Sequence, residues 1–218
     1  MLRRLPVLLG LSAVFVLSVG LTISFFQWQS NKHINNALEK AVTNANSGAD
    51  NGVPSTAPIS DDTFKNYTVP ANQPRYIFIN KLNVKAIILS LGVTSSNEMQ
   101  VPSNNNAAGW YNQSSLPGQP GAMLVDGHVG VGTYHGIFHN LNTLATGDII
   151  NIERGDGQLI NYKVFKKQTY DYDKVDMEAA LKPINSQKSG LNLITCTGEV
   201  IKGTNKYNQR LVVFTEQQ

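Results

Sequence analysis

The single cysteine of this chain and an arginine further along could do chemistry together. Cys196 ends one apolar run, and Arg210 opens the next one. If both runs are strands, the thiol and the guanidinium can lie side by side in a sheet. A fixed cation beside a thiol stabilises the thiolate, which is a nucleophile in acyl-transfer reactions. Such a site also needs a group that carries protons, and His128, which follows an apolar run and Gly127, is the candidate.

Each of these residues also has a plainer interpretation. A lone cysteine cannot form an internal disulfide, so Cys196 is a buried inert thiol, a partner for another chain or a reactive thiol. Arg210 could pair with a surface acid such as Glu199 or Glu216. It keeps its proton at physiological pH, so a general-base role is excluded. The chain has other histidines, expected in a polar segment, at the surface or in packing: His33, His135 and His139.

The elements that would position these residues are mostly short strands. From residue 75 to residue 215, apolar segments are bounded by glycine, proline and asparagine, and period-two alternation predicts strands in them. The expected strands are 76–79, 84–91, 122–126, 148–154, 159–172, 191–195 and 211–215. Helical turns are expected near 137–144 and 177–181. Many short strands with few helices favour a mainly β fold, a closed or nearly closed β-barrel, in one domain.

An apolar segment near the N-terminus predicts a membrane anchor. Residues 5–26 carry no charge and, as a helix, span about 30 Å, the thickness of a bilayer core. Arg3 and Arg4 precede this segment, so the N-terminus is expected in the cytoplasm. A cleaved signal peptide is the alternative, but its apolar region is usually shorter. The expected parts are a cytoplasmic tip and transmembrane helix at 1–30, a polar, largely disordered stalk at 31–73 and a catalytic domain at 74–218.

Several segments match, in order, the motifs of a known family. Thr195-Cys196 at a strand end resembles a nucleophile signature, Gly127-His128 resembles a turn with a catalytic histidine, and 207–214 resembles an arginine strand. Supporting matches are Gly109-Trp110-Tyr111, 117–121, 138–141 and 144–148. Over residues 74–216 the chain therefore resembles the sortases, the membrane-anchored cysteine transpeptidases of Gram-positive cell surfaces. It is most similar to the sortases of class F or class E.

The resemblance implies an eight-stranded β-barrel in which His128, Cys196 and Arg210 meet at a groove for a sorting signal similar to Leu-Pro-x-Thr-Gly. Cys196 would attack the carbonyl of the signal's threonine and form a thioacyl enzyme. The histidine would move protons, and the arginine would hold the substrate backbone and the developing oxyanion. Thr195 would place its hydroxyl near the substrate or the cysteine loop, or serve only as a buried strand residue. Asp126 stands where the family more often has a neutral residue, and it would bias the histidine or face solvent.

The implied partners are surface proteins that bear a C-terminal sorting signal, an amine acceptor (a peptidoglycan precursor or a pilin lysine) and the membrane. The expected location is the cell membrane, single-pass, with the catalytic domain outside. A net charge of +3 with 15% charged residues gives no basis for nucleic-acid binding. No clustered His and Cys set predicts a metal site, and no cofactor is expected, although some sortases use calcium.

Two other functions stay open at this point. A non-catalytic, membrane-tethered binding or assembly module on the same barrel would be expected to lose Cys196, His128 or Arg210. A cysteine protease that only hydrolyses would share the acyl-enzyme and differ in what resolves it. Residues 31–72 could also fold over the groove as a lid, although their composition does not require it.

Overall fold

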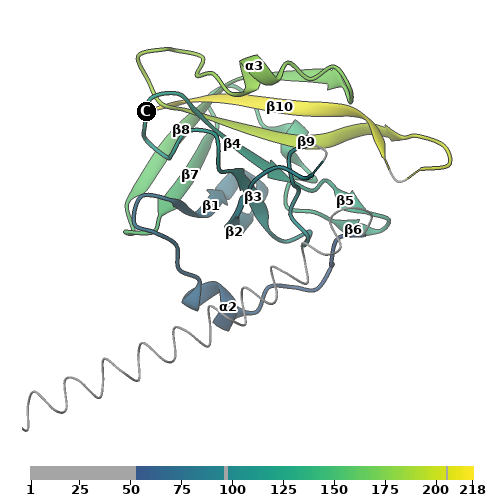
Figure 1. Cartoon of the computed structure of the whole chain (residues 1–218), viewed down its shortest axis with the longest axis horizontal. Coiled ribbons are helices and arrows are strands. Elements are labelled where there is room, and N and C mark those ends of the chain that lie inside the picture. The colour runs from purple at the N-terminus through teal and green to yellow at the C-terminus, as the bar shows by residue number, and fades with distance from the viewer. Residues whose placement is uncertain (1–52, 96–97, 205) are drawn as a thin grey trace, which may run out of the picture. The chain divides into compact units, whose positions relative to one another are not determined.

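The computed structural model describes residues 53–95, 98–204 and 206–218. Figure 1 follows these residues along the chain to the C-terminus. The elements in chain order are α2 (Asp61–Asn66), β1 (Pro74–Ile79), η1 (Asn80–Leu82), β2 (Val84–Leu91), β3 (Ala108–Tyr111), β4 (Ala122–Gly127), β5 (Gly130–Val131), β6 (Tyr134–His135), η2 (Leu141–Thr143), β7 (Ile149–Arg154), β8 (Leu159–Asp171), α3 (Met177–Ala180), β9 (Gly190–Val200) and β10 (Tyr207–Gln217).

Eight of these strands close into a barrel in the order β1-β2-β3-β4-β9-β10-β8-β7. Neighbouring strands are antiparallel except at two places, where β2 pairs with β3 and β4 pairs with β9 in parallel. β5 and β6 form a separate two-stranded hairpin. The mainly β, closed eight-stranded barrel with short helices, expected from the sequence, is confirmed.

The barrel interior is filled by side chains that alternate along each strand. On the first half of β8 the inward residues, such as Tyr162 and Val164, are buried, and the residues between them are exposed. A β-bulge at Phe165 then shifts the pairing with β10 by one residue. The alternation reverses beyond the bulge. Tyr170 therefore packs on the outer face of the barrel, against a second apolar cluster.

This second cluster covers the outer face of β4, β9 and β10. Leu124, Ile194 and Val212, one from each strand, lie in it, and α3 packs on them through Ala180. Figure 1 shows α3 above β10. The buried Asn192 ties α3 to β9, because its Nδ2 donates to the carbonyl of Ala180 at 2.8 Å. This part of the sheet is packed on both faces, so the backbone of β4, β9 and β10 is rigidly supported where the candidate site residues begin.

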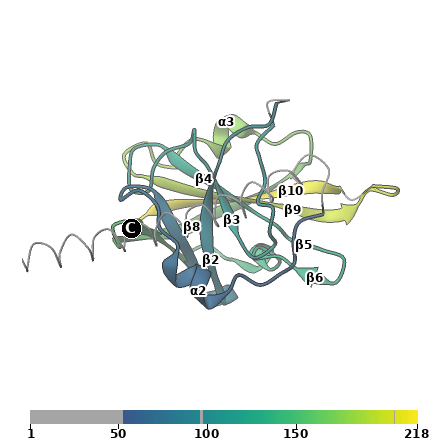
Figure 2. The same ribbon diagram turned by 60° about the horizontal axis from the view of Figure 1, so that its bottom comes forward.

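Residues 53–73, in the range where a stalk is expected, contact the barrel. Phe64 of α2 stacks on Tyr76 of β1, with ring centroids 4.4 Å apart. The buried Tyr67 donates its hydroxyl proton to the carbonyl of Ile88 on β2 at 2.5 Å. Figure 2 shows α2 close to β2. The described part of that range is therefore ordered on the barrel, and the domain boundary at residue 74 stays a prediction.

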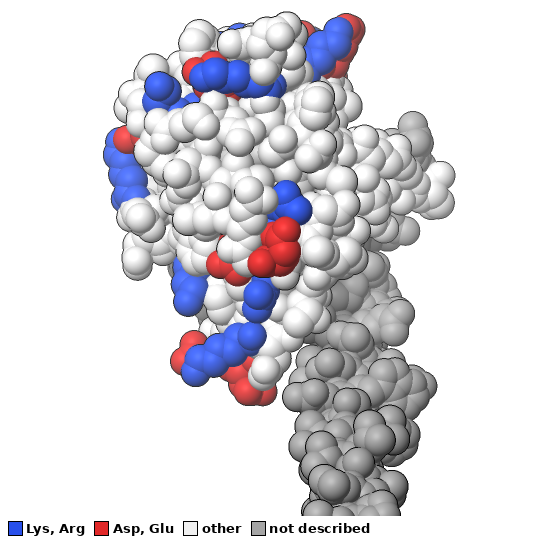
Figure 3. All heavy atoms as spheres, turned by 90° about the vertical axis from the view of Figure 1, so that its left-hand side faces the viewer, with Lys and Arg blue, Asp and Glu red and all other residues white. Residues whose placement is uncertain are grey.

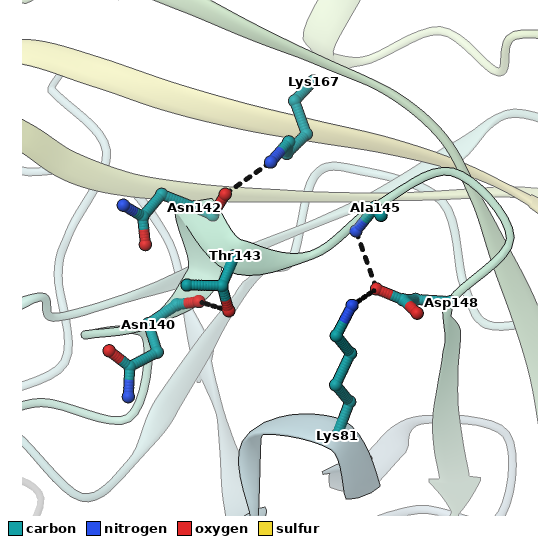
Figure 4. Close-up of polar contacts among 7 residues, drawn as sticks. All are labelled: Lys81, Asn140, Asn142, Thr143, Ala145, Asp148 and Lys167. Atoms are coloured by element: carbon teal, nitrogen blue, oxygen red, sulfur yellow. Dashed lines mark hydrogen bonds and ion pairs between the residues drawn. The ribbon is translucent and has the colours of Figure 1, made fainter.

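The loop that leads into β7 is fixed to the barrel by polar contacts (Figure 4). Asp148 accepts hydrogen bonds from Nζ of Lys81 and from the backbone N–H of Ala145, both at 2.7 Å. Lys167 of β8 donates to the carbonyl of Asn142. These contacts hold the loop that contains η2 against η1 and β8.

Some elements are not predicted by the sequence. The helical turns expected near 137–144 and 177–181 are present as η2 and α3. The sequence does not predict β3, because this strand begins with Ala108 and Gly109, which have low strand propensity. It does not predict β5 and β6 either, because each has only two residues. α2 lies in a polar stretch, although Ser60 before two acidic residues is a helix-start signal.

The membrane anchor predicted at residues 5–26 lies outside the described residues. Within 53–95, 98–204 and 206–218, no helix has the length and hydropathy to cross a membrane. The face shown in Figure 3 carries Lys and Arg as well as Asp and Glu, scattered among uncharged residues. On that face the charges do not form a patch of one sign.

Candidate active site

Cys196 and Arg210 are cross-strand partners. In the antiparallel pairing of β9 with β10, the Cα of Cys196 lies opposite the Cα of Arg210. The side chains of such partners leave the sheet on the same face, with Cβ atoms about 4.5–5.5 Å apart. That face is the outer one, because Ile194 and Val212, the next cross-strand pair on the same face, belong to the outer apolar cluster. The structure thus brings the thiol and the guanidinium together.

His128 follows the strand that flanks β9 on its other side. β4 runs parallel to β9, and their last pair joins Asp126 to Ile194. His128 and Cys196 each follow that pair by two residues, so the parallel pairing brings both to the same edge of the barrel. The histidine directly follows β4, and the cysteine and the arginine lie on β9 and β10, so three consecutive barrel strands position the three side chains (Figure 1).

Two contacts fix the turn that leads into His128. The Oγ1 of Thr195 donates to the carbonyl of Gly127 at 2.6 Å and so joins the ends of β9 and β4. A Cβ at Gly127 would lie 2.5 Å from the ring of Phe138, so only glycine fits there. Thr195 itself is 2% exposed. Its hydroxyl proton is used inside the barrel wall, which favours the interpretation of Thr195 as a buried strand residue.

The imidazole of His128 contacts a backbone carbonyl. Its Nε2 lies within hydrogen-bond distance of the carbonyl of Pro102, in the loop before β3. A carbonyl only accepts hydrogen bonds, so Nε2 carries the proton of the neutral ring and Nδ1 keeps a free lone pair. A base that is oriented by a third group is the usual arrangement beside a catalytic nucleophile. The sequence contains no signal for this contact, because nearly every residue offers the same carbonyl.

A buried acid interacts with these residues. Asp126 is 9% exposed, which rules out the solvent-facing interpretation. Burial raises the pKa of its carboxyl to about 6, while the charge of His128, the backbone N–H of Gly127 and the charge of Arg210 act to lower it. The group is therefore mostly ionised at neutral pH and gains its proton near pH 6.

The thiol of Cys196 is held in its protonated form. Burial raises its pKa, Arg210 acts in the opposite direction, and the charge of Asp126 raises the pKa further. A base must therefore take the proton when the sulfur attacks. The free Nδ1 of His128, at the same edge of the barrel, is suited to that role.

Arg210 is held by carbonyls. Its Nη1 donates to the carbonyl of Gln209 at 2.9 Å and to that of Tyr207 at 3.2 Å. In the described ranges no carboxylate forms an ion pair with it, and Glu216, one of the alternative partners, pairs with Lys188 at 3.3 Å. The N–H groups on Nε and Nη2 make no hydrogen bond to other described residues. They are available to a substrate carbonyl or to an oxyanion.

The acids between β8 and β9 have structural partners. Asp171 pairs with Lys174 at 2.9 Å, and Asp176 caps α3 by accepting the backbone N–H of Ala179 at 2.9 Å. Where the chain is described, no group of three or more His, Cys, Asp and Glu could hold a metal ion. Calcium dependence stays untested.

A closed β-barrel with a cysteine, a histidine and an arginine on consecutive strands is, by fold and site, suited to acyl transfer through a thiol. The model of the sortase domain matches residues 77–218, and the chain belongs to the sortase family. Sortases are cysteine transpeptidases that act on sorting-signal substrates. No curated protein matches the chain.

Solved sortase structures share the barrel. Sortase C2 of pilus island 1 from Group B Streptococcus is 20% identical, with a TM-score of 0.52 over 84% of this chain and 98% of that chain. Sortase C1 from Streptococcus agalactiae is 24% identical, with a TM-score of 0.52 over 85% and 86%. Sortase C from Streptococcus pneumoniae is 21% identical, with a TM-score of 0.52 over 83% and 87%. These identities establish the fold alone, so the similarity to class F or class E stays a prediction.

Proposed function

We propose that this sortase cleaves a Leu-Pro-x-Thr-Gly-like sorting signal and joins the acyl fragment to an amine at the cell envelope. The observation that carries the proposal is the strand register. It pairs Cys196 with Arg210 and brings His128 to the same barrel edge through the parallel strand beside them. The partly buried Tyr170, whose Cα lies opposite that of Arg210, offers an aromatic surface beside the site for the leucine or proline of the signal.

In the acylation step, the Sγ of Cys196 attacks the threonine carbonyl of the signal, and the thiol proton passes to Nδ1 of His128. A C–S bond forms, and the negative charge on the carbonyl oxygen is held by the free N–H groups of Arg210. The C–N bond to glycine then breaks. The leaving amine takes the proton from the histidine, and a thioester remains on the sulfur.

In the transfer step, an acceptor amine attacks the thioester and gives a proton to His128. The C–S bond breaks, an amide forms, and the sulfur of Cys196 recovers its proton. The proposed acceptors are the amine of a peptidoglycan precursor or a pilin lysine. The pneumococcal sortase C structure is described in terms of pilin substrate specificity, which supports the second acceptor class.

The nucleophile is tested with the full-length chain purified in detergent, a mixed library of sorting-signal peptides and a set of amine acceptors. We expect mass spectrometry to show an acyl-enzyme on Cys196 and a ligated product. Cys196→Ala should abolish both, because alanine has no nucleophile, and should keep the unfolding temperature of the wild type. Cleavage by the alanine variant would refute the assignment.

The same experiment separates the other functions. A wild-type chain that forms no acyl-enzyme with any peptide would indicate a binding module. One that forms only the hydrolysed acid, even with excess amine, would indicate a protease.

We also propose that residues 5–26 anchor the chain in the cell membrane, with the catalytic domain outside. The uncharged length of this segment and the preceding arginines support the proposal. A chain that alkaline carbonate releases from membranes without detergent would contradict it.

A further inference from the structure

The loop that orients the imidazole of His128 is itself held by chain from outside the barrel. Pro102, whose carbonyl contacts Nε2 of His128, is buried and begins a short segment at 102–106, here named the imidazole loop. Residues 55–57, here named the strap, run beside this loop and form an isolated parallel β-bridge with it. The strap precedes the part of the chain that matches the family model, which begins at residue 77.

Backbone and side-chain hydrogen bonds join the strap to one side of the imidazole loop. The backbone N–H of Ser55 donates to the carbonyl of Ser103 at 2.8 Å, and the N–H of Asn105 donates to the carbonyl of Ser55 at 2.9 Å. The side chain of Asn106 adds a bond from its Nδ2 to the carbonyl of Ala57 at 3.0 Å. The residues directly after Pro102 are thus paired with the strap rather than with a barrel strand.

The opposite side of the imidazole loop faces the turn that holds the backbone of His128. The N–H of Ile137 donates to the carbonyl of Asn105 at 2.9 Å, and the N–H of Phe138 donates to the carbonyl of His128 at 3.0 Å. A Cβ at Gly136 would lie 2.1 Å from that same carbonyl, so the turn is closely fitted to it. The loop is therefore fixed between the strap on one side and the histidine's own support on the other.

Two further observations indicate that this contact does more than add packing. The side chain of Asn105 is 1% exposed, and among the described residues neither its Nδ2 nor its Oδ1 has a hydrogen-bond partner. Such a buried unsatisfied group lowers stability and is often retained for function. The strap also lines a wide, solvent-open hollow of about 830 Å³, together with residues 132–134. Hydrogen bonds to the loop, rather than a filled apolar interface, are what hold the strap.

We propose that the strap is a positioning element of the active site, which keeps the Pro102 carbonyl on Nε2 of His128 and so leaves Nδ1 as the proton-transferring nitrogen. The role of Nδ1 in proton transfer rests on the function proposed above. The orientation of the His128 ring by the strap does not depend on that function. The strap thereby belongs to the catalytic unit even though it lies in the range where a stalk is expected.

A matched pair of variants at one position tests this. Ser55→Pro removes the backbone N–H that donates to Ser103, and a proline is compatible with the extended backbone of the strap. Ser55→Ala keeps that N–H and serves as the control. Both are made in the full-length chain in detergent. The readouts are steady-state cleavage of a peptide with a Leu-Pro-x-Thr-Gly segment, randomised at x, and the Nε2–H proton signal of the ¹⁵N-labelled imidazole, assigned by its absence in His128→Gln.

We expect Ser55→Pro to lose the Nε2–H signal and to lower kcat by about ten- to a hundredfold at unchanged KM, because the base is misplaced while the groove is not. Ser55→Ala should keep both. Retention of the signal and of kcat in the proline variant, or a loss of kcat that only follows the unfolded fraction, would overturn the proposal. If the wild type shows no transpeptidation, the proposed function fails. The Nε2–H proton signal of His128 then still decides whether the strap orients the ring.

If Ser55→Pro does not fold, the double variant Asn104→Ala and Asn106→Ala replaces it, because the Nδ2 atoms of these two residues both donate to the carbonyl of Ala57, each at 3.0 Å. Its control is Asn66→Ala, which removes an equivalent bond within α2, from Nδ2 to the carbonyl of Asp62 at 2.9 Å. The same signal and the same kcat should fall in the first variant only. Equal behaviour of the two variants would refute the role of the strap.

Discussion

Among the individual residues, Asp126 contributes to the resting state of the sulfur. Burial raises the pKa of the Cys196 thiol, Arg210 lowers it, and the charge of the buried Asp126 carboxylate raises it further. Oxidation of cysteine follows its thiolate character, so a thiol that keeps its proton is protected between turnovers. In the proposed mechanism, the attack of Cys196 then depends on proton transfer to His128 rather than on a thiolate that is already present.

Asp126→Asn removes that charge and should lower the pKa of the Cys196 thiol. The measurement is the rate of alkylation by iodoacetamide against pH, and its midpoint should move to lower pH. Asp173→Asn, which neutralises an exposed acid, should leave the midpoint in place. A midpoint that stays or rises in the Asp126 variant would show that the carboxylate does not act on the sulfur.

Arg210→Lys should lower kcat by about 10²–10³-fold, the usual effect of losing one oxyanion donor. The ammonium of lysine cannot bond its neighbouring carbonyls and an oxyanion with the planar geometry of a guanidinium. Single-turnover acylation with the library-selected peptide is the measurement. Arg154→Lys, at a guanidinium paired with Asp156 at 2.8 Å, is the control. Near-normal acylation in the Arg210 variant would make that residue structural.

Among the elements, the parallel pair β4 and β9 decides whether the site forms. The sequence predicts both strands, because each is a short apolar run bounded by turn residues. It does not predict that they pair, since a parallel partner lies far away in the chain and leaves no local pattern. The pairing of β9 with β10 is easier to foresee because the two strands are consecutive in the chain, although β9 continues past Cys196 to Val200 and β10 begins before Arg210, at Tyr207.

Thr195→Val tests the link between these strands. The change removes the hydroxyl that donates to Gly127 and should lower the free energy of unfolding by about 1–3 kcal/mol. It should also lower kcat, because the turn that leads into His128 loses its hydrogen bond to β9. Thr215→Val is the control, since its buried Oγ1 donates to the carbonyl of Leu191 at 2.6 Å, away from the site.

Both variants should lose similar stability, measured by urea unfolding, but only Thr195→Val should lose turnover. Equal kcat in the two variants would indicate that the hydrogen bond to Gly127 is purely structural.

The features that the sequence does not predict share a physical cause. β3 is a strand because β2 and β4 lie on both sides of it, not because of its own residues. The orientation of His128 depends on a carbonyl of Pro102, which side-chain chemistry does not reveal. The alternation of inward and outward side chains along β8 reverses at a bulge at Phe165, which only the pairing with β10 defines. Each is a tertiary effect, whereas the residues of the site were recognisable from type and order.

For the whole molecule, Asp126 makes stability depend on pH. The pKa of its carboxyl is about 6 in the folded chain, compared with the ordinary value of 3.8 that applies to the unfolded chain. Below about pH 4 both states hold the proton, and the group has no effect. As the pH rises to about 6 the unfolded chain ionises first, so the folded state loses up to about 2–3 kcal/mol relative to it.

Asp126→Asn should therefore stabilise the full-length chain at pH 7 by about 2 kcal/mol and leave its stability unchanged at pH 4. Urea unfolding at the two pH values measures this, with Asp173→Asn as the control. A variant that is less stable than the wild type at pH 7 would show that the carboxylate is favoured in the folded state.

The place of β10 in the barrel has a consequence for biosynthesis. It follows β9 in the chain, lies between β9 and β8 in the barrel and carries Arg210. A nascent polypeptide emerging from the ribosome thus displays the sulfur of Cys196 before the guanidinium of Arg210 has been made. The pair is complete only once β10 has docked between its two neighbours, so this late step of folding also assembles the site.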